Sequence, residues 1–242
     1  MVEIIVKEPV DLRDTVLVTG FRGFGMVGYM VSKHIALALG GEKVGYILTR
    51  ETPPLVLIEE DGVGFPFEIY YSRRAKATII VNRALPERDN ADEYARSIAE
   101  WASRVGVRFT VLVGGLSREF MPSNEEHGYR WISNRYYRGP RLEAPKMEPG
   151  LGVMGPLALL YIYMDYYKVP SIMVLPYSLV DEIDYNAAVN GVKLVSEKLI
   201  GVKSDVKALE ELASRQKEEF KRLLQLMAEQ AKSEGEDKGI YM

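Results

Sequence analysis

The chain has 242 residues, of which 47% are hydrophobic and 27% charged, so it has the composition of a globular protein with room for one large core. Its net charge of −3 argues against general binding of nucleic acid, and the lack of cysteine excludes disulfides, thiolate metal sites and a cysteine nucleophile. The charged N-terminus lacks a signal-peptide core and no run approaches about 20 apolar residues, so we expect a cytoplasmic protein without a membrane-spanning helix.

The first half of the sequence alternates apolar runs with turn residues. Strands are expected at residues 3–7, 15–19, 44–49, 55–58, 67–71 and 77–81, where apolar and β-branched residues gather. The segments 55–58 and 67–71 are expected to pair as an antiparallel hairpin, because the residues between them favour turns. One helix is expected to follow the glycines after residue 19 and reach Leu39, and another to run from Asp89 or Asn90 to about Val105.

The second half continues this alternation around a long insertion. Strands are expected at 109–113 and 170–175 with a helix over 153–167, whereas 116–149 is irregular apart from a strand near 129–133. Asp184 is expected to cap a helix that Gly201 ends, before a charged helix that reaches about Lys232. The alternation predicts an α/β fold with a largely parallel sheet. We place an α/β core in residues 1–201, an amphipathic helix in 202–232 and a flexible tail in 233–242.

The loop from Gly20 to Gly28 is the first candidate site. Gly23, Gly25 and Gly28 match the pattern G-x-G-x-x-G, and Glu51 stands near the position of a ribose-binding acid. The bulk of Phe24 and the absence of the Lys and Ser/Thr of a P-loop argue against a phosphate site. We favour a packing turn and keep a nucleotide- or nucleoside-handling enzyme that uses this loop as the alternative.

Other polar residues give weaker signals of chemistry. His34 lies in an apolar helix and reads as a half-buried residue with its own hydrogen bond, and His127 with its two acidic neighbours reads as a solvated loop. Asp184 is explained as a helix cap, and Asp181 and Glu182 as surface charge. We therefore expect no catalytic residues, no metal and no cofactor.

Residues 130–141, with the sequence RWISNRYYRGPR, interleave arginines with aromatic residues. This mixture suits single-stranded nucleic acid, and it also suits a protein interface, where Trp, Tyr and Arg supply much of the binding energy. The negative net charge favours the interface.

The predicted C-terminal helix carries an apolar stripe with alternating spacings of three and four residues. The stripe comprises positions 206, 209, 213, 216, 220, 223 and 227. A helix that packs on its own domain needs such a stripe, and so does a helix that pairs with another subunit. Gln216 weakens a coiled coil, and the two interpretations remain open.

The chain ends in a polar tether that carries an apolar tripeptide. Residues 232–239 are polar or glycine, and Ile240, Tyr241 and Met242 follow them. An apolar end on a solvated tether is unusual for a chain that merely frays. The tripeptide resembles the hydrophobic-Tyr-X (HbYX) docking motif of proteasome activators. That resemblance implies insertion between α-subunits of the 20S ring, with the Tyr241 ring in a pocket and the carboxylate of Met242 paired with a lysine.

Four segments of the body add to this resemblance. In order they are GFRGFGMVGYMVSKHI, TPPLVLIEEDG, PGLGVMGPLALLYIYMDYYKVPSIMVLP and DYNAAVNGVKLVSEKL. They resemble the second type of the proteasome assembly chaperone family in its archaeal branch, although Met26 stands where Asn is expected in many relatives. The resemblance implies a phosphorylase/hydrolase-like three-layer α/β/α fold without established catalysis, and homo-oligomers that assist proteasome assembly or open its gate without ATP.

The sequence thus predicts a non-enzymatic proteasome assembly chaperone or activator. Its expected partners are 20S proteasome α-subunits and further copies of the chain, with no nucleic acid and no membrane. The rival hypotheses are the nucleotide-handling enzyme and an oligomeric scaffold whose tail is incidental.

Overall fold

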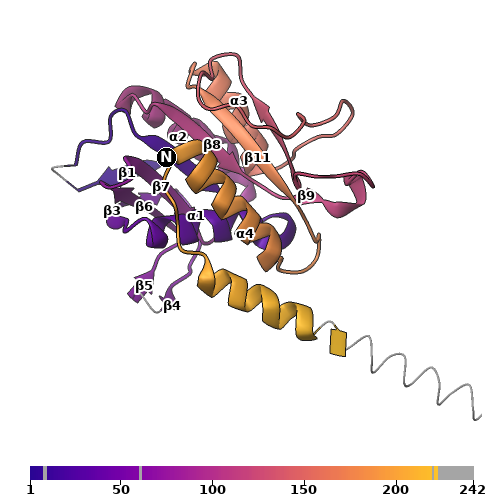
Figure 1. The fold of residues 1–242 in the computed structure, drawn as a ribbon. Helices are drawn as coiled ribbons and strands as arrows, with labels where there is room; N and C mark the ends of the chain where they lie inside the picture. Colours follow the sequence, from indigo (N-terminus) through magenta and orange to yellow (C-terminus); the bar gives the residue numbers. More distant parts are fainter. Residues whose placement is uncertain (8–9, 60–61, 220, 223–242) are drawn as a thin grey trace, which may run out of the picture.

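The computed structural model describes residues 1–7, 10–59, 62–219 and 221–222. Within them, nine strands form one central sheet in the order β1-β3-β6-β7-β2-β8-β11-β10, with β9 beside β11 (Figure 1). These strands are β1 (Glu3–Val6), β2 (Val16–Gly20), β3 (Glu42–Leu48), β6 (Phe67–Ser72), β7 (Ala77–Asn82), β8 (Phe109–Val113), β9 (Leu116–Ser117), β10 (Tyr129–Ser133) and β11 (Ser171–Ser178).

The centre of the sheet is parallel and both of its sides are antiparallel. β7, β2, β8 and β11 pair in parallel, while β1, β3 and β6 on one side and β10 on the other pair antiparallel. The central strands are buried along their whole length, as their continuous apolar sequences predict for strands covered on both faces.

Helices cover both faces of the sheet and make three layers. α1 (Val27–Ala38) and α4 (Tyr185–Lys193) pack side by side on one face, and α2 (Ala91–Val105) and α3 (Pro156–Tyr166) cover the other (Figure 1). Short 3₁₀ turns occupy Phe24–Met26, Arg88–Asn90 and Arg118–Phe120, and α4 continues as a π-helical segment, Leu194–Ile200. The predicted three-layer α/β/α fold is confirmed, with the parallel pairing concentrated at its centre.

The predicted hairpin between residues 55–58 and 67–71 is wrong. β4 (Leu57–Glu59) pairs with β5 (Gly62–Gly64) in a separate two-stranded sheet, and β6 pairs with β3 and β7 inside the main sheet. Five of the six β6 residues are buried, so this strand needs cover on both faces, whereas β4 exposes Ile58. The small β4–β5 sheet projects beside the main sheet in Figure 1.

The last described helix covers residues 207–219 and 221–222 and begins beside α4 (Figure 1). Val206 and Leu209 belong to the core under α1 and α4, and Ala213 is also buried. The first part of the apolar stripe therefore packs on its own domain. Positions 220, 223 and 227 lie outside the described residues, so pairing by the rest of the stripe and the division at residue 201 stay predictions.

Candidate functional site

The loop between β2 and α1 packs against the protein's own backbone. A Cβ on Gly20 would lie 2.5 Å from the carbonyl oxygen of Gly28, and a Cβ on Gly28 would lie 2.6 Å from that of Phe21. Gly25 has a φ of 61°, and its carbonyl oxygen accepts a hydrogen bond from Asp184 N at 3.0 Å. Backbone atoms thus fill the space beside Gly28 that a phosphate would need.

The strand order separates this loop from Glu51. β3, which precedes Glu51, is three strands away from β2, with β6 and β7 between them. In a dinucleotide-binding fold the glycine loop and the ribose-binding acid follow adjacent strands. The geometry therefore gives no support to the nucleotide interpretation of this loop.

A cavity of about 630 Å³ opens beyond the carboxyl ends of β2 and β8. The strand order reverses between these two strands, a place where α/β proteins often bind ligands. Side chains that are mostly apolar line this cavity, among them Phe21, Phe24, Leu116, Phe120, Val153 and Val180. Ser117 also lines it, but its Oγ accepts a hydrogen bond from Glu119 N at 3.2 Å, the geometry of a turn cap rather than of an activated nucleophile.

Asp184 is a buried structural acceptor at this edge. Its carboxylate accepts hydrogen bonds from Ala187 N at 3.0 Å and Leu179 N at 3.0 Å, and it pairs with Arg118 at 2.7 Å. The predicted helix cap is confirmed. Because its oxygens are occupied by these donors, Asp184 is poorly placed to act as a general base.

A buried ion network follows β7 and was not predicted from the sequence. The guanidinium of Arg83 contacts the carboxylates of Glu59, at 2.7 Å, and Glu68, and both Arg83 and Glu68 are almost fully buried. Lys33 reaches Glu59 at 2.6 Å, and Lys43 reaches Glu68 at 2.6 Å. The network attaches the β4–β5 sheet to the body of the protein.

Charge pairing shifts the ionisation of this network. Burial of Glu59 disfavours its charge, but hydrogen bonds from Arg83 and Lys33 outweigh burial and lower the pKa of Glu59 to about 2. Burial also raises the pKa of Tyr70, whose hydroxyl donates to Glu68, to about 12. Glu59 therefore stays ionised and attached to Arg83 at neutral pH.

The insertion at residues 130–141 divides into buried and exposed parts. Arg130 is buried and pairs with Glu125 and, at 2.6 Å, with Glu148, and Trp131 Nε1 donates to Ala144 O at 2.7 Å. These contacts tie the two side chains to other parts of the insertion 116–149, so they are not free to bind a partner. Arg135, Arg138 and Arg141 are exposed, so the interface, which stays a prediction, can use these three arginines but not Arg130.

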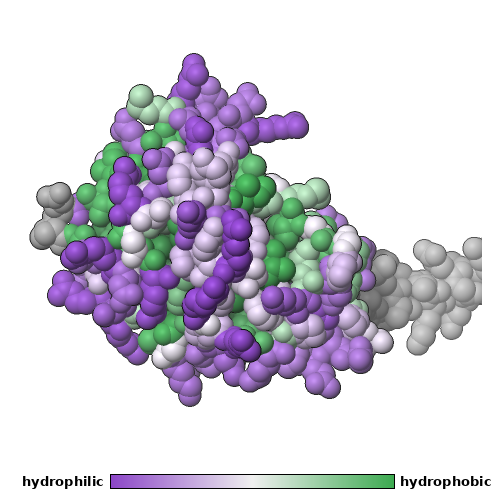
Figure 2. All heavy atoms as spheres, turned by 90° about the horizontal axis from the view of Figure 1, so that it is seen from above, coloured by the Kyte–Doolittle hydropathy of each residue, from purple (hydrophilic) through white to green (hydrophobic). Residues whose placement is uncertain are grey.

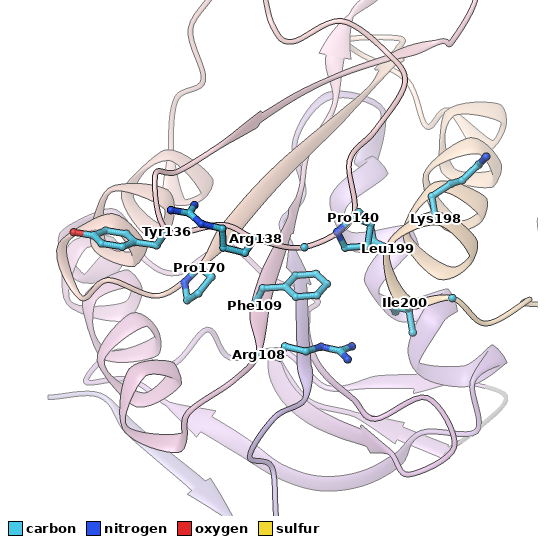
Figure 3. A pocket seen from close by; sticks show the side chains of 11 residues that line it. Arg108, Phe109, Tyr136, Arg138, Pro140, Pro170, Lys198, Leu199 and Ile200 are labelled. Carbon is cyan, nitrogen blue, oxygen red and sulfur yellow. The ribbon is translucent and has the colours of Figure 1, made fainter.

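A second cavity, of about 530 Å³, lies at the opposite edge of the parallel strands, where β8 and β11 begin (Figure 3). We call it the basic pocket; Arg108, Phe109, Tyr136, Arg138, Pro140 and Lys198 are among its lining residues. Its parts come from the insertion, from the start of β8 and from the end of the helix after α4. Because they are distant in the sequence, no single motif marks the pocket.

The predicted docking residues Ile240, Tyr241 and Met242 lie outside the described residues. His34 Nε2 contacts Asp205 O at 2.6 Å, so its predicted hydrogen bond is confirmed. Within the described part of the chain, no cluster of three or more His, Asp or Glu side chains forms a candidate metal site. Every helix in that part is too short or too polar to span a membrane.

Comparison with known proteins adds a family match. The model of the PAC2 family matches residues 17–224. The chain is 25% identical over 240 residues to the uncharacterized protein MJ1210 of Methanocaldococcus jannaschii, a match that covers 90% of this chain and 86% of the relative.

Solved structures share the fold over almost the whole chain. Pyrococcus furiosus PbaA, described as an archaeal homolog of proteasome-assembly chaperone, matches with a TM-score of 0.77 at 20% identity and covers 100% of this chain and 99% of its own. Pyrococcus furiosus PbaB, described as an archaeal proteasome activator, matches with a TM-score of 0.73 at 21% identity and covers 92% and 98%.

Proposed function

The chain belongs to the PAC2 family, and on that premise we propose that it is a proteasome assembly chaperone or ATP-independent activator. The observation that carries this proposal is the match, over at least 92% of the chain, to the folds of PbaA and PbaB, one described as a chaperone homologue and the other as an activator. In this proposal the protein acts in the cytoplasm by binding the proteasome, and it catalyses no reaction of its own.

The proposed contact is the C-terminal tripeptide. Ile240 and Tyr241 would enter a pocket between α-subunits of the 20S ring, and Met242 would supply the terminal carboxylate. An aromatic ring buries a large area and a carboxylate pairs well with a cation, so a short segment can act as an anchor. Several copies in a homo-oligomer would present several tails, and the resulting avidity would offset the weakness of each one.

The carboxyl edge of the sheet is consistent with a binding role. Asp184 and Ser117 serve as caps there, and Gly20, Gly25 and Gly28 serve close packing. An enzyme of this architecture would keep a nucleophile and a base poised at this edge. These observations favour a partner protein over a small-molecule substrate.

Truncation of the tail tests the proposal. Residues 1–239 and the variant Tyr241→Ala should lose 20S binding and peptidase stimulation by about 10-fold or more, because the anchor is gone. The matched control is Tyr166→Ala, which changes a tyrosine that is 73% exposed on α3. Binding and stimulation that survive the truncation would show that the tail is not the contact.

A further inference from the structure

The basic pocket has an apolar floor. Phe109 is 4% exposed and packs edge-on against Tyr137, with ring centroids 5.4 Å apart, and Leu199 is also buried. In Figure 3, Pro140 and Leu199 lie beside Phe109, and Pro170 lies on its other side. The volume of about 530 Å³ falls in the range of small-molecule sites, roughly 300–1,000 Å³. The floor therefore suits a flat apolar group.

Cations from three segments surround this floor. Arg108 precedes β8, Arg138 belongs to the insertion and Lys198 lies in the π-helical segment after α4. The lining residues of the described chain include no Asp or Glu. Among the described residues neither arginine forms an ion pair, and Lys198 only approaches Glu143, at 4.0 Å. The charge of this rim exceeds that of one carboxylate, whereas a phosphate monoester carries about −1.5 to −2 at pH 7.

Arg138 presents a fixed pair of free donors. Its Nη1 donates to two backbone carbonyls, Arg135 O at 2.7 Å and Tyr137 O at 2.8 Å. Its Nε and Nη2 donate to no atom of the described residues, and together they form the edge of a guanidinium that binds two oxygens of one phosphate or carboxylate. Because Nη1 is already held, the side chain loses little freedom when its free edge binds an anion.

The turn that carries Arg138 is itself anchored to the sheet. Asn134, which is 7% exposed, accepts hydrogen bonds through Oδ1 from Tyr137 N at 3.1 Å and from Ser171 N, at the start of β11, at 3.1 Å. The hydroxyl of Tyr137 donates to Pro140 O at 2.9 Å and closes the turn. The arginine is therefore held in position before a ligand binds, and such preorganisation increases affinity.

The helix end on the other side of the pocket sets the orientation of a ligand. α4 and its π-helical continuation end at Gly201, which lines the pocket. The carboxyl end of a helix carries partial negative charge, so it repels an anion. Figure 3 places Arg138 on the opposite side of the pocket from Leu199. The anionic group of a ligand is therefore expected at Arg138, with the apolar group over Phe109 and toward Leu199.

We propose that the basic pocket binds a small organic phosphate, a phosphate monoester of a flat apolar or aromatic group. The phosphate pairs with the free edge of Arg138, and the flat group lies on Phe109 between Pro140 and Pro170. Arg108 adds positive charge at the rim. This site goes beyond the proposed function and does not rest on it, because that function concerns the family and the C-terminal segment, whereas this site is built from the amino edge of the sheet.

Calorimetric titration of the full chain with four small ligands tests the proposal, and it needs no 20S. Naphthyl phosphate should bind at least about 10-fold more tightly than inorganic phosphate, which lacks the ring, and than naphthol, which lacks the charge. Naphthoate carries a single negative charge on the same ring and should bind about 3-fold more weakly than naphthyl phosphate. All titrations are made at one ionic strength, so that salt screens the charges equally.

Substitutions at the rim separate this site from the general charge of the protein. Arg138→Gln should weaken binding of naphthyl phosphate about 10-fold or more, because two charge-assisted hydrogen bonds are lost. Arg108→Gln should weaken it about 3-fold; this side chain only stacks on Phe109, so its removal leaves the turn around Arg138 intact. Arg141→Gln is the matched control. It removes an exposed arginine of the same insertion that does not line the pocket, and it should leave the affinity unchanged.

Four outcomes would overturn the proposal. The first is no binding of naphthyl phosphate at millimolar concentration. The second is an equal affinity for naphthyl phosphate and any one of the three comparison ligands, because the ring and the phosphate would then not both be recognised. The third is an equal loss in Arg141→Gln and Arg138→Gln, which would assign the binding to the general charge of this face. The fourth is displacement of naphthyl phosphate by an equimolar amount of single-stranded oligouridylate, which would assign this surface to nucleic acid.

Discussion

Arginines at the two edges of the parallel strands differ in whether they contact a carboxylate. At the carboxyl edge, Arg83 contacts Glu59 and Glu68, and Arg118 contacts Asp184. At the amino edge, Arg108 and Arg138 have no carboxylate partner among the described residues. Arg83 and Arg118 thus help to hold the carboxyl edge together, whereas the two arginines at the amino edge have no such role.

This contrast is the reverse of what the architecture leads one to expect. Ligands of open α/β sheets usually bind beyond the carboxyl ends of the strands. Here that edge holds close-packed glycines, helix caps, a buried ion network and a largely apolar cavity. Figure 2 draws the molecule from above the view of Figure 1, and hydrophilic residues cover most of the face seen there, with smaller hydrophobic patches between them. Changes at the carboxyl edge should therefore affect stability, and changes at the amino edge should affect binding.

Arg83→Met gives the largest expected effect. It leaves Glu68 buried without its main cation, and removing one partner of a buried pair typically costs about 3–5 kcal/mol. Urea unfolding measures the loss, and Arg88→Met, at an exposed arginine nearby, is the matched control. A loss below about 1 kcal/mol would mean that the network does not hold this edge.

Gly28→Ala should be the next most damaging change. The added methyl group would meet Phe21 O at 2.6 Å and Val113 O, and backbone atoms cannot move aside as a side chain can. We expect a loss of about 3 kcal/mol in unfolding experiments. Gly23→Ala, five residues earlier in the same loop, has no atom within 4 Å of the added Cβ and should change stability little. Similar losses at both positions would show that the loop's role is not close packing.

Lowering the pH should reduce the stability that ionised Glu59 gives to the carboxyl edge, and it should do so in a defined pH range. The pKa of Glu59 is lowered from 4.5 to about 2, so its ionised form stabilises the folded state above pH 4.5. This contribution is lost as the pH falls from 4.5 to about 2, and we expect it to be roughly 2 kcal/mol after allowing for solvent screening. Glu59→Gln should flatten the stability curve in that range, measured by thermal unfolding against pH, while Glu87→Gln at an exposed site should not. An unchanged slope in Glu59→Gln would contradict this role.

Much of the fold could be predicted because its signals are local. The sequence shows β2 and β8 as continuous apolar runs and α2 as a capped helix. Each of these elements begins and ends within two residues of its predicted bounds. The predicted pairing of residues 55–58 with residues 67–71 was wrong because strand pairing depends on which faces of the whole sheet are buried. A short apolar run does not carry that information.

The candidate sites were harder to predict because their partners are distant in the sequence. Arg130 looks like an interface residue beside Trp131, yet it is buried against Glu125 and Glu148. Glu68, a charge inside an apolar strand, was a signal that could have pointed to a buried pair, although not to Arg83 as its partner. The basic pocket joins segments from residue 108 to residue 201, so only the fold brings its cations together.

Arg108→Gln and Lys198→Gln give the smallest expected effect on stability and complete the comparison of the two edges. Both side chains are exposed, Arg108 only stacks on Phe109 at 5.4 Å, and Lys198 lies 4.0 Å from Glu143. Each change should therefore alter the free energy of unfolding by less than about 0.5 kcal/mol, measured by urea unfolding. A loss above about 2 kcal/mol would show that these cations are structural, like Arg83, and the distinction between the two edges would fail. Unchanged stability would instead show that these exposed cations do not hold the fold together, in contrast to Arg83 at the carboxyl edge.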